Sequence, residues 1–203
     1  MKIYEMKIAP NPRRVRIFLS EKNISDVEFV ELDVQNGENL TDEFKAKNPL
    51  KKVPVLELDD GQCISETVAI CRYFEEVYPE TPLMGVTPLE KAQIEMWQRW
   101  VEFYFMIPTG MCFQHSSGYF KDRMNPVKEW GEECRQQIFK FMKILNEHLE
   151  GNTYLLGESF CIADITAFCA MGFNKVNRIT ISDEYPHLAR WYALVSARPS
   201  SKA

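Results

Sequence analysis

The first part of the chain alternates between two hydrophobic periods, and each change of period marks a new predicted element. Alternating or continuous apolar runs predict strands at residues 2–6, 27–34, 53–58 and 62–64. Apolar positions spaced three and four residues apart predict helices at residues 12–22 and 42–46, and a third helix from residue 65. The predicted order of elements is therefore βαβαββα.

The third predicted helix combines one apolar face with a polar start. Its apolar positions follow the spacing i, i+3, i+4, i+7 and i+8, at Ile70, Tyr73, Phe74, Val77 and Tyr78. Ser65-Glu66-Thr67 form the start. The first N–H groups of a helix have no partner within it, so they can bind a carboxylate. We therefore expect a small-molecule site near this turn.

The strand predicted at 53–58 contains a proline near its beginning. Pro54 has no N–H to donate, so the strand lies at a sheet edge, contains a bulge, or ends where its backbone faces a ligand. Asp59-Asp60-Gly61 follows as a tight turn and predicts a hairpin with 62–64.

Residues 79–86, with two prolines and a glycine, interrupt both periods and predict a linker. Thr87-Pro88-Leu89-Glu90 then forms a capping box with proline in the first helical position. From there the pattern is helical to the end of the chain. We expect one domain at 1–79, a linker at 80–87 and an all-helical domain at 88–203.

Aromatic and aliphatic side chains form stripes along the predicted helices of the second domain. The first stripe comprises Met96, Trp97, Trp100, Val101 and Tyr104. Further helices are predicted from about residue 125, at 162–171 and at 186–195. Such stripes more often form a core than a ligand pocket, although the segment 104–119 is apolar enough for both.

Composition and charge narrow the possible functions. The 203 residues are 45% hydrophobic and carry a formal net charge of -5, with no basic cluster. This argues against nucleic acid as the main partner. No apolar stretch approaches the roughly 20 residues that a membrane span needs, and the first ten residues lack the apolar core of a signal peptide. We expect a soluble cytoplasmic protein with no membrane partner.

Neither the cysteines nor the histidines suggest a metal site. The six cysteines are scattered without a C-x-x-C, and none of the three histidines has a second potential ligand at a metal-like spacing. We expect most cysteines to be reduced and packed in the core, and we assign no metal.

This order of elements, with proline at the start of the third strand and an all-helical second half, resembles the cytosolic glutathione S-transferase family over essentially the whole chain. The segments 37–44, 48–54 and 65–70 are especially similar to theta-class and related bacterial members. The resemblance implies an α+β two-domain fold, with a thioredoxin-like βαβαββα domain that binds glutathione and a helix-bundle domain. It also implies a hydrophobic electrophile as second substrate, and a homodimer.

The resemblance also implies a set of glutathione contacts. The Val53 backbone would pair with the cysteinyl part, with a cis bond before Pro54. Glu66 would face the γ-glutamyl amine, and Thr67 would hold the γ-glutamyl carboxylate through its hydroxyl and its N–H. Lys52 and Asn39 match positions near the glycyl carboxylate.

The chain departs from the family pattern at the residue that should stabilise the glutathione thiolate. Ala9 occupies the position of the theta-class serine, and no C-x-x-C follows the first strand. Tyr4 lies within the first predicted strand and cannot take the place of the tyrosine that other classes use. Asn11 is the best substitute, because its amide can donate hydrogen bonds at the positive end of a helix. It could equally be a plain N-cap, followed by Pro12 as the first helical residue.

The resemblance therefore favours an enzyme that joins the glutathione thiolate to a hydrophobic electrophile, held near Tyr104, Phe105 and Phe113. A glutathione-binding or regulatory protein without turnover is the alternative that Ala9 favours. A glutathione-dependent reductase or peroxidase is a third possibility, although no cysteine lies at the first helix start.

Overall fold

The computed structural model describes the whole chain, Met1–Ala203, which divides into two compact units. The first comprises Met1–Pro82 with Lys202–Ala203, and the second comprises Leu83–Ser201. No helix is both long enough and apolar enough to cross a membrane.

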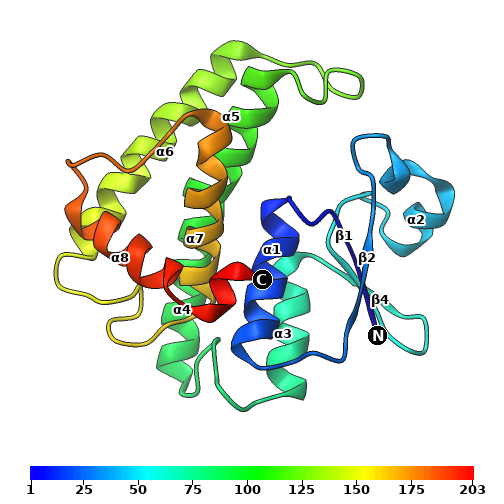
Figure 1. Cartoon of the computed structure of the whole chain (residues 1–203), viewed down its shortest axis with the longest axis horizontal. Coiled ribbons are helices and arrows are strands. Elements are labelled where there is room, and N and C mark those ends of the chain that lie inside the picture. Colours follow the sequence, from blue (N-terminus) through cyan, green and yellow to red (C-terminus); the bar gives the residue numbers. More distant parts are fainter. The chain divides into compact units, whose positions relative to one another are not determined.

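The first unit is a four-stranded mixed sheet with helices on both faces (Figure 1). Its elements are β1 (Lys2–Glu5), α1 (Pro10–Glu21), β2 (Glu28–Glu31), α2 (Asp42–Lys47), β3 (Val55–Glu57), β4 (Cys63–Ser65) and α3 (Thr67–Val77), with a 3-10 turn, η1 (Glu38–Leu40), before α2. This confirms the βαβαββα order. The strand order is β2-β1-β3-β4, with β1 parallel to β2 and antiparallel to β3.

The two faces of the sheet hold different helices, as the alternation of side chains along a strand requires. On one face, Ile3 and Leu56 are paired across β1 and β3 and are fully buried. Glu5, on the same face, pairs with Arg16 of α1. On the other face, Tyr4 makes an edge contact with Phe44 of α2. Helices α1 and α3 therefore pack together on one side and α2 on the other (Figure 1).

Helix α1 begins two residues earlier than the sequence predicted. Ala9 is the N-cap, with φ −77° and ψ 143°, and the helix starts at Pro10. The expectation that Asn11 is the N-cap is therefore wrong, because Asn11 is already the second helical residue. Both Pro10 and Pro12 are accommodated, since the first-turn N–H groups have no intrahelical partner to lose.

The second unit is all helical. Its elements are α4 (Pro88–Val101), η2 (Glu102–Met106), α5 (Ile107–Ser117), α6 (Lys128–His148), α7 (Ile162–Phe173), η3 (Asn174–Asn177), α8 (Pro186–Ser196) and η4 (Pro199–Lys202). The predicted capping box is confirmed, because the Thr87 hydroxyl accepts from the Glu90 N–H and the Glu90 carboxylate accepts from the Thr87 N–H. Every residue from Ile162 to Met171 is buried, so α7 is the central helix of this unit.

A wide π-helical turn, η2, joins α4 to α5 without a loop. Pro108 follows it and is the second residue of α5. Proline inside a continuous helix removes an N–H and collides with the carbonyl four residues earlier. A π-turn widens the helix at such a place, so the chain continues as one long rod through Pro108.

Asp164 holds the start of α7 to two other segments. Its carboxylate accepts hydrogen bonds from Leu155 N at 3.0 Å, Cys161 N at 3.1 Å and Trp191 Nε1 at 2.9 Å. The residue is fully buried. Burial raises its pKa to about 6, and the hydrogen bonds, led by the one from Trp191, offset only part of this effect.

Candidate functional site

The segment before β3 leaves backbone groups open to a ligand. The Val53–Pro54 peptide bond is cis, and β3 begins only at Val55. Pro54 is buried, whereas Val53 is half-buried. The N–H and C=O of Val53 are not used in any backbone hydrogen bond of the loops and turns. An extended peptide can pair with a backbone of this kind.

Two asparagine side chains hold the loop that leads to Val53. Asn39 Nδ2 donates to Lys51 O at 2.7 Å, and Asn48 Nδ2 donates to Lys52 O at 2.9 Å. Both asparagines are buried, at 6% and 1% exposure, while the Lys52 side chain is exposed. The supporting role of Asn48 was not predicted, although the residue begins the segment that carries the family resemblance.

The start of α3 lies beside this loop, because Ser65, the last residue of β4, pairs with Val55, the first residue of β3. Glu66 is the N-cap and has φ 72° and ψ 124°, in the region that favours glycine. A non-glycine residue held there indicates a local constraint of the kind found at ligand sites. Thr67 is the first helical residue and is 5% exposed. Its hydroxyl lies 3.5 Å from Asn11 O, so the structure brings the starts of α1 and α3 together.

At the start of α1, most possible hydrogen-bond donors are already used or absent. The N–H of Ala9 donates to Met6 O at 2.9 Å, and that of Arg13 donates to Ala9 O at 3.3 Å. Pro10 and Pro12 have no N–H. Asn11 remains, with its backbone N–H and its exposed side-chain amide. Its Oδ1 accepts a hydrogen bond from Arg14 Nη1 at 3.1 Å.

Tyr4, Lys47 and the cysteines, which could in principle stabilise a thiolate, are engaged elsewhere or removed from solvent. The Tyr4 hydroxyl donates to Glu57 Oε2 at 2.7 Å, and burial, followed by this bond to a carboxylate, raises the pKa of Tyr4. Lys47 also binds Glu57 Oε2, at 2.6 Å. All cysteines except Cys63 are buried, and burial raises the pKa of Cys63 as well. No group of three or more His, Cys, Asp or Glu side chains could hold a metal ion.

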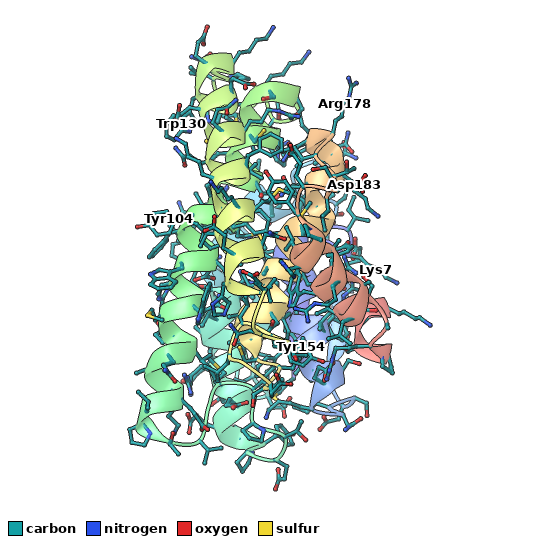
Figure 2. All side chains as sticks on the ribbon, turned by 90° about the vertical axis from the view of Figure 1, so that its left-hand side faces the viewer. Lys7, Tyr104, Trp130, Tyr154, Arg178 and Asp183 are labelled. Carbon is teal, nitrogen blue, oxygen red and sulfur yellow. The ribbon has the colours of Figure 1, made fainter.

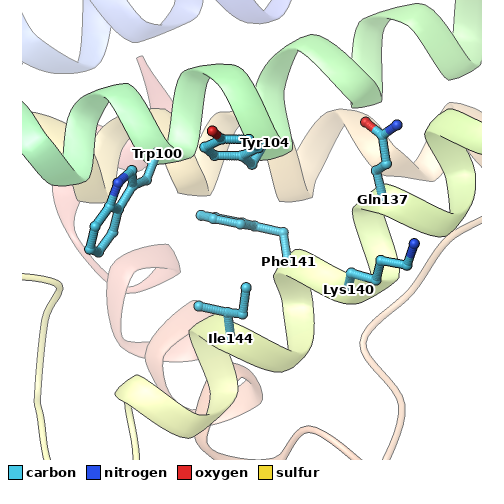
Figure 3. A pocket seen from close by; sticks show the side chains of 6 residues that line it. All are labelled: Trp100, Tyr104, Gln137, Lys140, Phe141 and Ile144. Carbon is cyan, nitrogen blue, oxygen red and sulfur yellow. The ribbon is translucent and has the colours of Figure 1, made fainter.

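The three residues predicted to hold the electrophile lie in different surroundings within the helical unit. Tyr104 is 58% exposed and lines a groove of about 540 Å³ between α4–η2 and α6 (Figure 3). The ring of Phe141 lies next to it, with ring centroids 6.5 Å apart. Phe105, the adjacent residue, is fully buried and also lies next to the Phe141 ring, with centroids 5.6 Å apart.

Phe113 lines a second, more polar pocket of about 600 Å³. This pocket lies between α5, α6 and the turn after α7, and its lining includes Arg135, Glu132 and Arg178. The ring of Phe113 contacts Tyr119, Phe120 and Phe173. Figure 2 shows Tyr104 and Arg178 toward opposite edges of the helical unit. Tyr104 and Phe113 therefore do not line one cavity.

Comparison with known families identifies both units. Residues 3–82 match the model of the glutathione S-transferase N-terminal domain, and residues 104–199 match that of the C-terminal domain. The chain is 37% identical over 205 residues to glutathione S-transferase 2 of Saccharomyces cerevisiae, covering 100% of this chain and 88% of that protein. The crystal structure of Gtt2 from the same species matches with a TM-score of 0.92 and 37% identity, over 100% of this chain and 99% of that one.

A second group of relatives has another function. The chain is 32% identical over 179 residues to elongation factor 1-gamma 2 of Oryza sativa subsp. japonica. The match covers 87% of this chain but only 41% of that protein. The two-unit scaffold thus also occurs as part of longer proteins.

Proposed function

The chain belongs to the glutathione S-transferase family, and we propose that it transfers the thiolate of glutathione to hydrophobic electrophiles. One observation carries the mechanism. At the start of α1, beside Thr67, Asn11 keeps a backbone N–H and a side-chain NH₂ group for which the structure shows no hydrogen bond, so both can face an anion. Glutathione held by α3 would place its sulfur near these donors.

The binding residues follow from the family pattern and suit their surroundings. The Val53 backbone would pair with the cysteinyl part of glutathione, beside the buried Pro54. Glu66 and Thr67 would hold the γ-glutamyl group, since the first N–H groups of α3 face no helical partner. Lys52, whose side chain is exposed, would reach the glycyl carboxylate. Asn39 would contribute mainly by fixing the Lys51 carbonyl.

The chemical role of Asn11 is to favour the ionised sulfur. A free thiol has a pKa of about 8.5 and is mostly protonated at neutral pH. Hydrogen bonds from Asn11 would lower this pKa, and the thiol proton would pass to solvent. The sulfur lone pair then forms a bond to the electrophilic carbon while the leaving group departs or the attacked double bond accepts the electrons. Of the predicted electrophile residues Tyr104, Phe105 and Phe113, we keep Phe113 as the proposed contact, because Phe105 is fully buried and Tyr104 lines the separate groove between α4–η2 and α6.

A pH titration of bound glutathione tests the proposal directly. The ultraviolet absorbance of the thiolate is followed in wild-type protein and in Asn11→Ala, with free glutathione as the reference. We expect a bound thiol pKa at least one unit below about 8.5 in the wild type, and a value near 8.5 in the variant. S-methylglutathione, which has no thiol, should bind both proteins equally. An unshifted wild-type titration would reject the transferase mechanism.

A binding protein without turnover is the second candidate, because Ala9 replaces the usual serine and elongation factor 1-gamma shares the scaffold. This candidate predicts that glutathione binds with an unchanged thiol pKa and that a chloronitrobenzene electrophile is not consumed above the uncatalysed rate. The pH titration of the bound thiol and the rate of electrophile consumption thus distinguish the two candidates.

We further propose a cytoplasmic homodimer, as is usual for this family. Large apolar side chains are exposed along α4 and α6, including Trp100 at 39% and Ile144 at 48%. Exposed apolar patches of this kind mark interaction surfaces. Trp100→Glu should then shift the protein from dimer to monomer in sedimentation analysis, whereas Lys45→Glu, an exposed change on α2, should not.

A further inference from the structure

We infer that Arg14 is a positioning residue for the proposed thiolate site, holding the Asn11 amide so that its N–H groups face the ligand. The inference rests on the proposed function and adds a residue that acts through Asn11. It starts from one contact, the 3.1 Å hydrogen bond from Arg14 Nη1 to Asn11 Oδ1.

The chemistry of the two side chains fixes the direction of the amide. A guanidinium has only donors, so the atom of Asn11 that faces Arg14 must be the oxygen. The Nδ2 group, with its two hydrogens, is then on the other branch of the amide. An unsupported asparagine on a surface could present either atom, and its oxygen would repel a thiolate. The contact with Arg14 removes that alternative orientation.

Arg14 is buried and Asn11 is exposed, which suits a supporting role for Arg14 and contact with the ligand for Asn11. Arg14 is 3% exposed and lies one helical turn after Asn11, on the buried side of α1. Asn11 is exposed. A long side chain that is fixed by packing can hold a short exposed one in a single rotamer. Arg14 can therefore orient the amide from a buried position and does not need to touch the ligand.

The positive charge of Arg14 strengthens the same effect. An amide whose oxygen accepts a hydrogen bond from a cation becomes a better donor at its nitrogen, since linked hydrogen bonds polarise one another. A charge with little access to water is also weakly screened. Removing Arg14 should thus both free the amide to rotate and weaken its N–H groups as donors.

The test compares Arg14→Met, Arg14→Lys, Asn11→Ala and the double variant Asn11→Ala/Arg14→Met. The first readout is the pKa of the bound glutathione thiol, and the second is the pH dependence of kcat/KM with a chloronitrobenzene electrophile. Binding of S-methylglutathione and the thermal unfolding midpoint report the integrity of the fold and the site. Lys7→Gln is the matched control, because it removes one positive charge from an exposed residue near the same helix start.

We expect Arg14→Met to raise the pKa of the bound thiol by about one unit, which means about tenfold less thiolate at pH values below that pKa. The pH profile of kcat/KM should shift by the same amount. S-methylglutathione affinity should stay within about twofold, and Lys7→Gln should change neither readout. On the Asn11→Ala background, Arg14→Met should add no further shift. Arg14→Lys keeps the charge and one donor, so it should recover part of the effect and covers the case in which Arg14→Met fails to fold.

Two results would overturn the inference while leaving the transferase mechanism intact. One is an unchanged thiol pKa in both Arg14→Met and Arg14→Lys when Asn11→Ala raises it. The other is an equal shift from Arg14→Met with or without Asn11, which would mean that Arg14 acts by direct charge. An unshifted thiol in the wild-type protein would instead reject the proposed mechanism itself.

Discussion

Replacing Asp164 with asparagine should cost the protein less stability at pH 7 than at pH 4.5. The carboxylate is fully buried, and burial raises its pKa from the ordinary value of 3.8 to about 6. The folded state therefore holds the proton more tightly than the unfolded state. The stabilisation from this group is fully present below the unfolded pKa and is lost as the pH rises through the folded one.

These two pKa values set the size of the effect. Between pH 4.5 and pH 7 the wild type should lose about 2 kcal/mol through Asp164, whereas asparagine does not titrate and loses nothing there. Asparagine keeps an oxygen for Trp191 Nε1 and Leu155 N but turns an NH₂ toward Cys161 N, which should cost about 1–3 kcal/mol. At pH 4.5 the asparagine variant should therefore be clearly less stable than the wild type. At pH 7 the wild type has lost its own contribution from Asp164, so the two proteins should be much closer in stability.

Urea unfolding of both proteins across this pH range provides the measurement. The useful quantity is the difference in unfolding free energy at each pH, because the other carboxylates contribute equally to both proteins and cancel. The difference should shrink by about 2 kcal/mol from pH 4.5 to pH 7. A difference that stays constant, or that grows with pH, would refute the conclusion that Asp164 is held with a raised pKa.

Three further substitutions test other features of the fold. Cys161→Ser should improve the N-cap of α7 and raise the unfolding free energy by about 1 kcal/mol, seen as a rise in Tm of about 2–4 °C; a fall would contradict this. Glu66→Gly should relieve the positive φ and stabilise the protein by about 1 kcal/mol in denaturant unfolding, while weakening glutathione binding in calorimetry. Gly131→Ala places a Cβ 2.5 Å from Ser116 Oγ and 3.2 Å from Ser116 N, so it should cost about 1–3 kcal/mol; an unchanged Tm would refute the close approach of α5 and α6.

The order of elements could be predicted from the sequence because it depends on local patterns. The capping box at Thr87 needs only residues that are neighbours in the chain, and it forms as predicted. The start of α1 could not be located as well, because Pro10 and Pro12 both suit a first helical turn and Ala9 offers no side-chain cap. The fold decides which proline begins the helix: the Ala9 N–H donates to Met6 O, Ala9 is the N-cap, and Pro10 is the first helical residue.

The candidate site was predicted in part for the same reason. Val53, Glu66 and Thr67 lie in segments whose sequence carries the family resemblance, so their positions could be named. The contact between Arg14 and Asn11 depends on the rotamers of two side chains, and the contact between Thr67 and Asn11 joins helices that are far apart in sequence. No period or motif contains that information. The sequence does contain Pro108, which could have indicated the wide turn before it.

The wide turn at Glu102–Met106 affects how residues of this long helix can be matched to those of other proteins. It takes up about one residue more than a regular α-helical turn, and each extra residue rotates everything beyond it by about 100°. An alignment with a relative that has a regular helix here needs a one-residue gap inside this segment. Without the gap, every position from Ile107 to Ser117 would be assigned to the wrong face of the helix. A position beyond the turn that is matched by simple counting, such as Phe113, would then be misplaced even though the two folds superimpose closely.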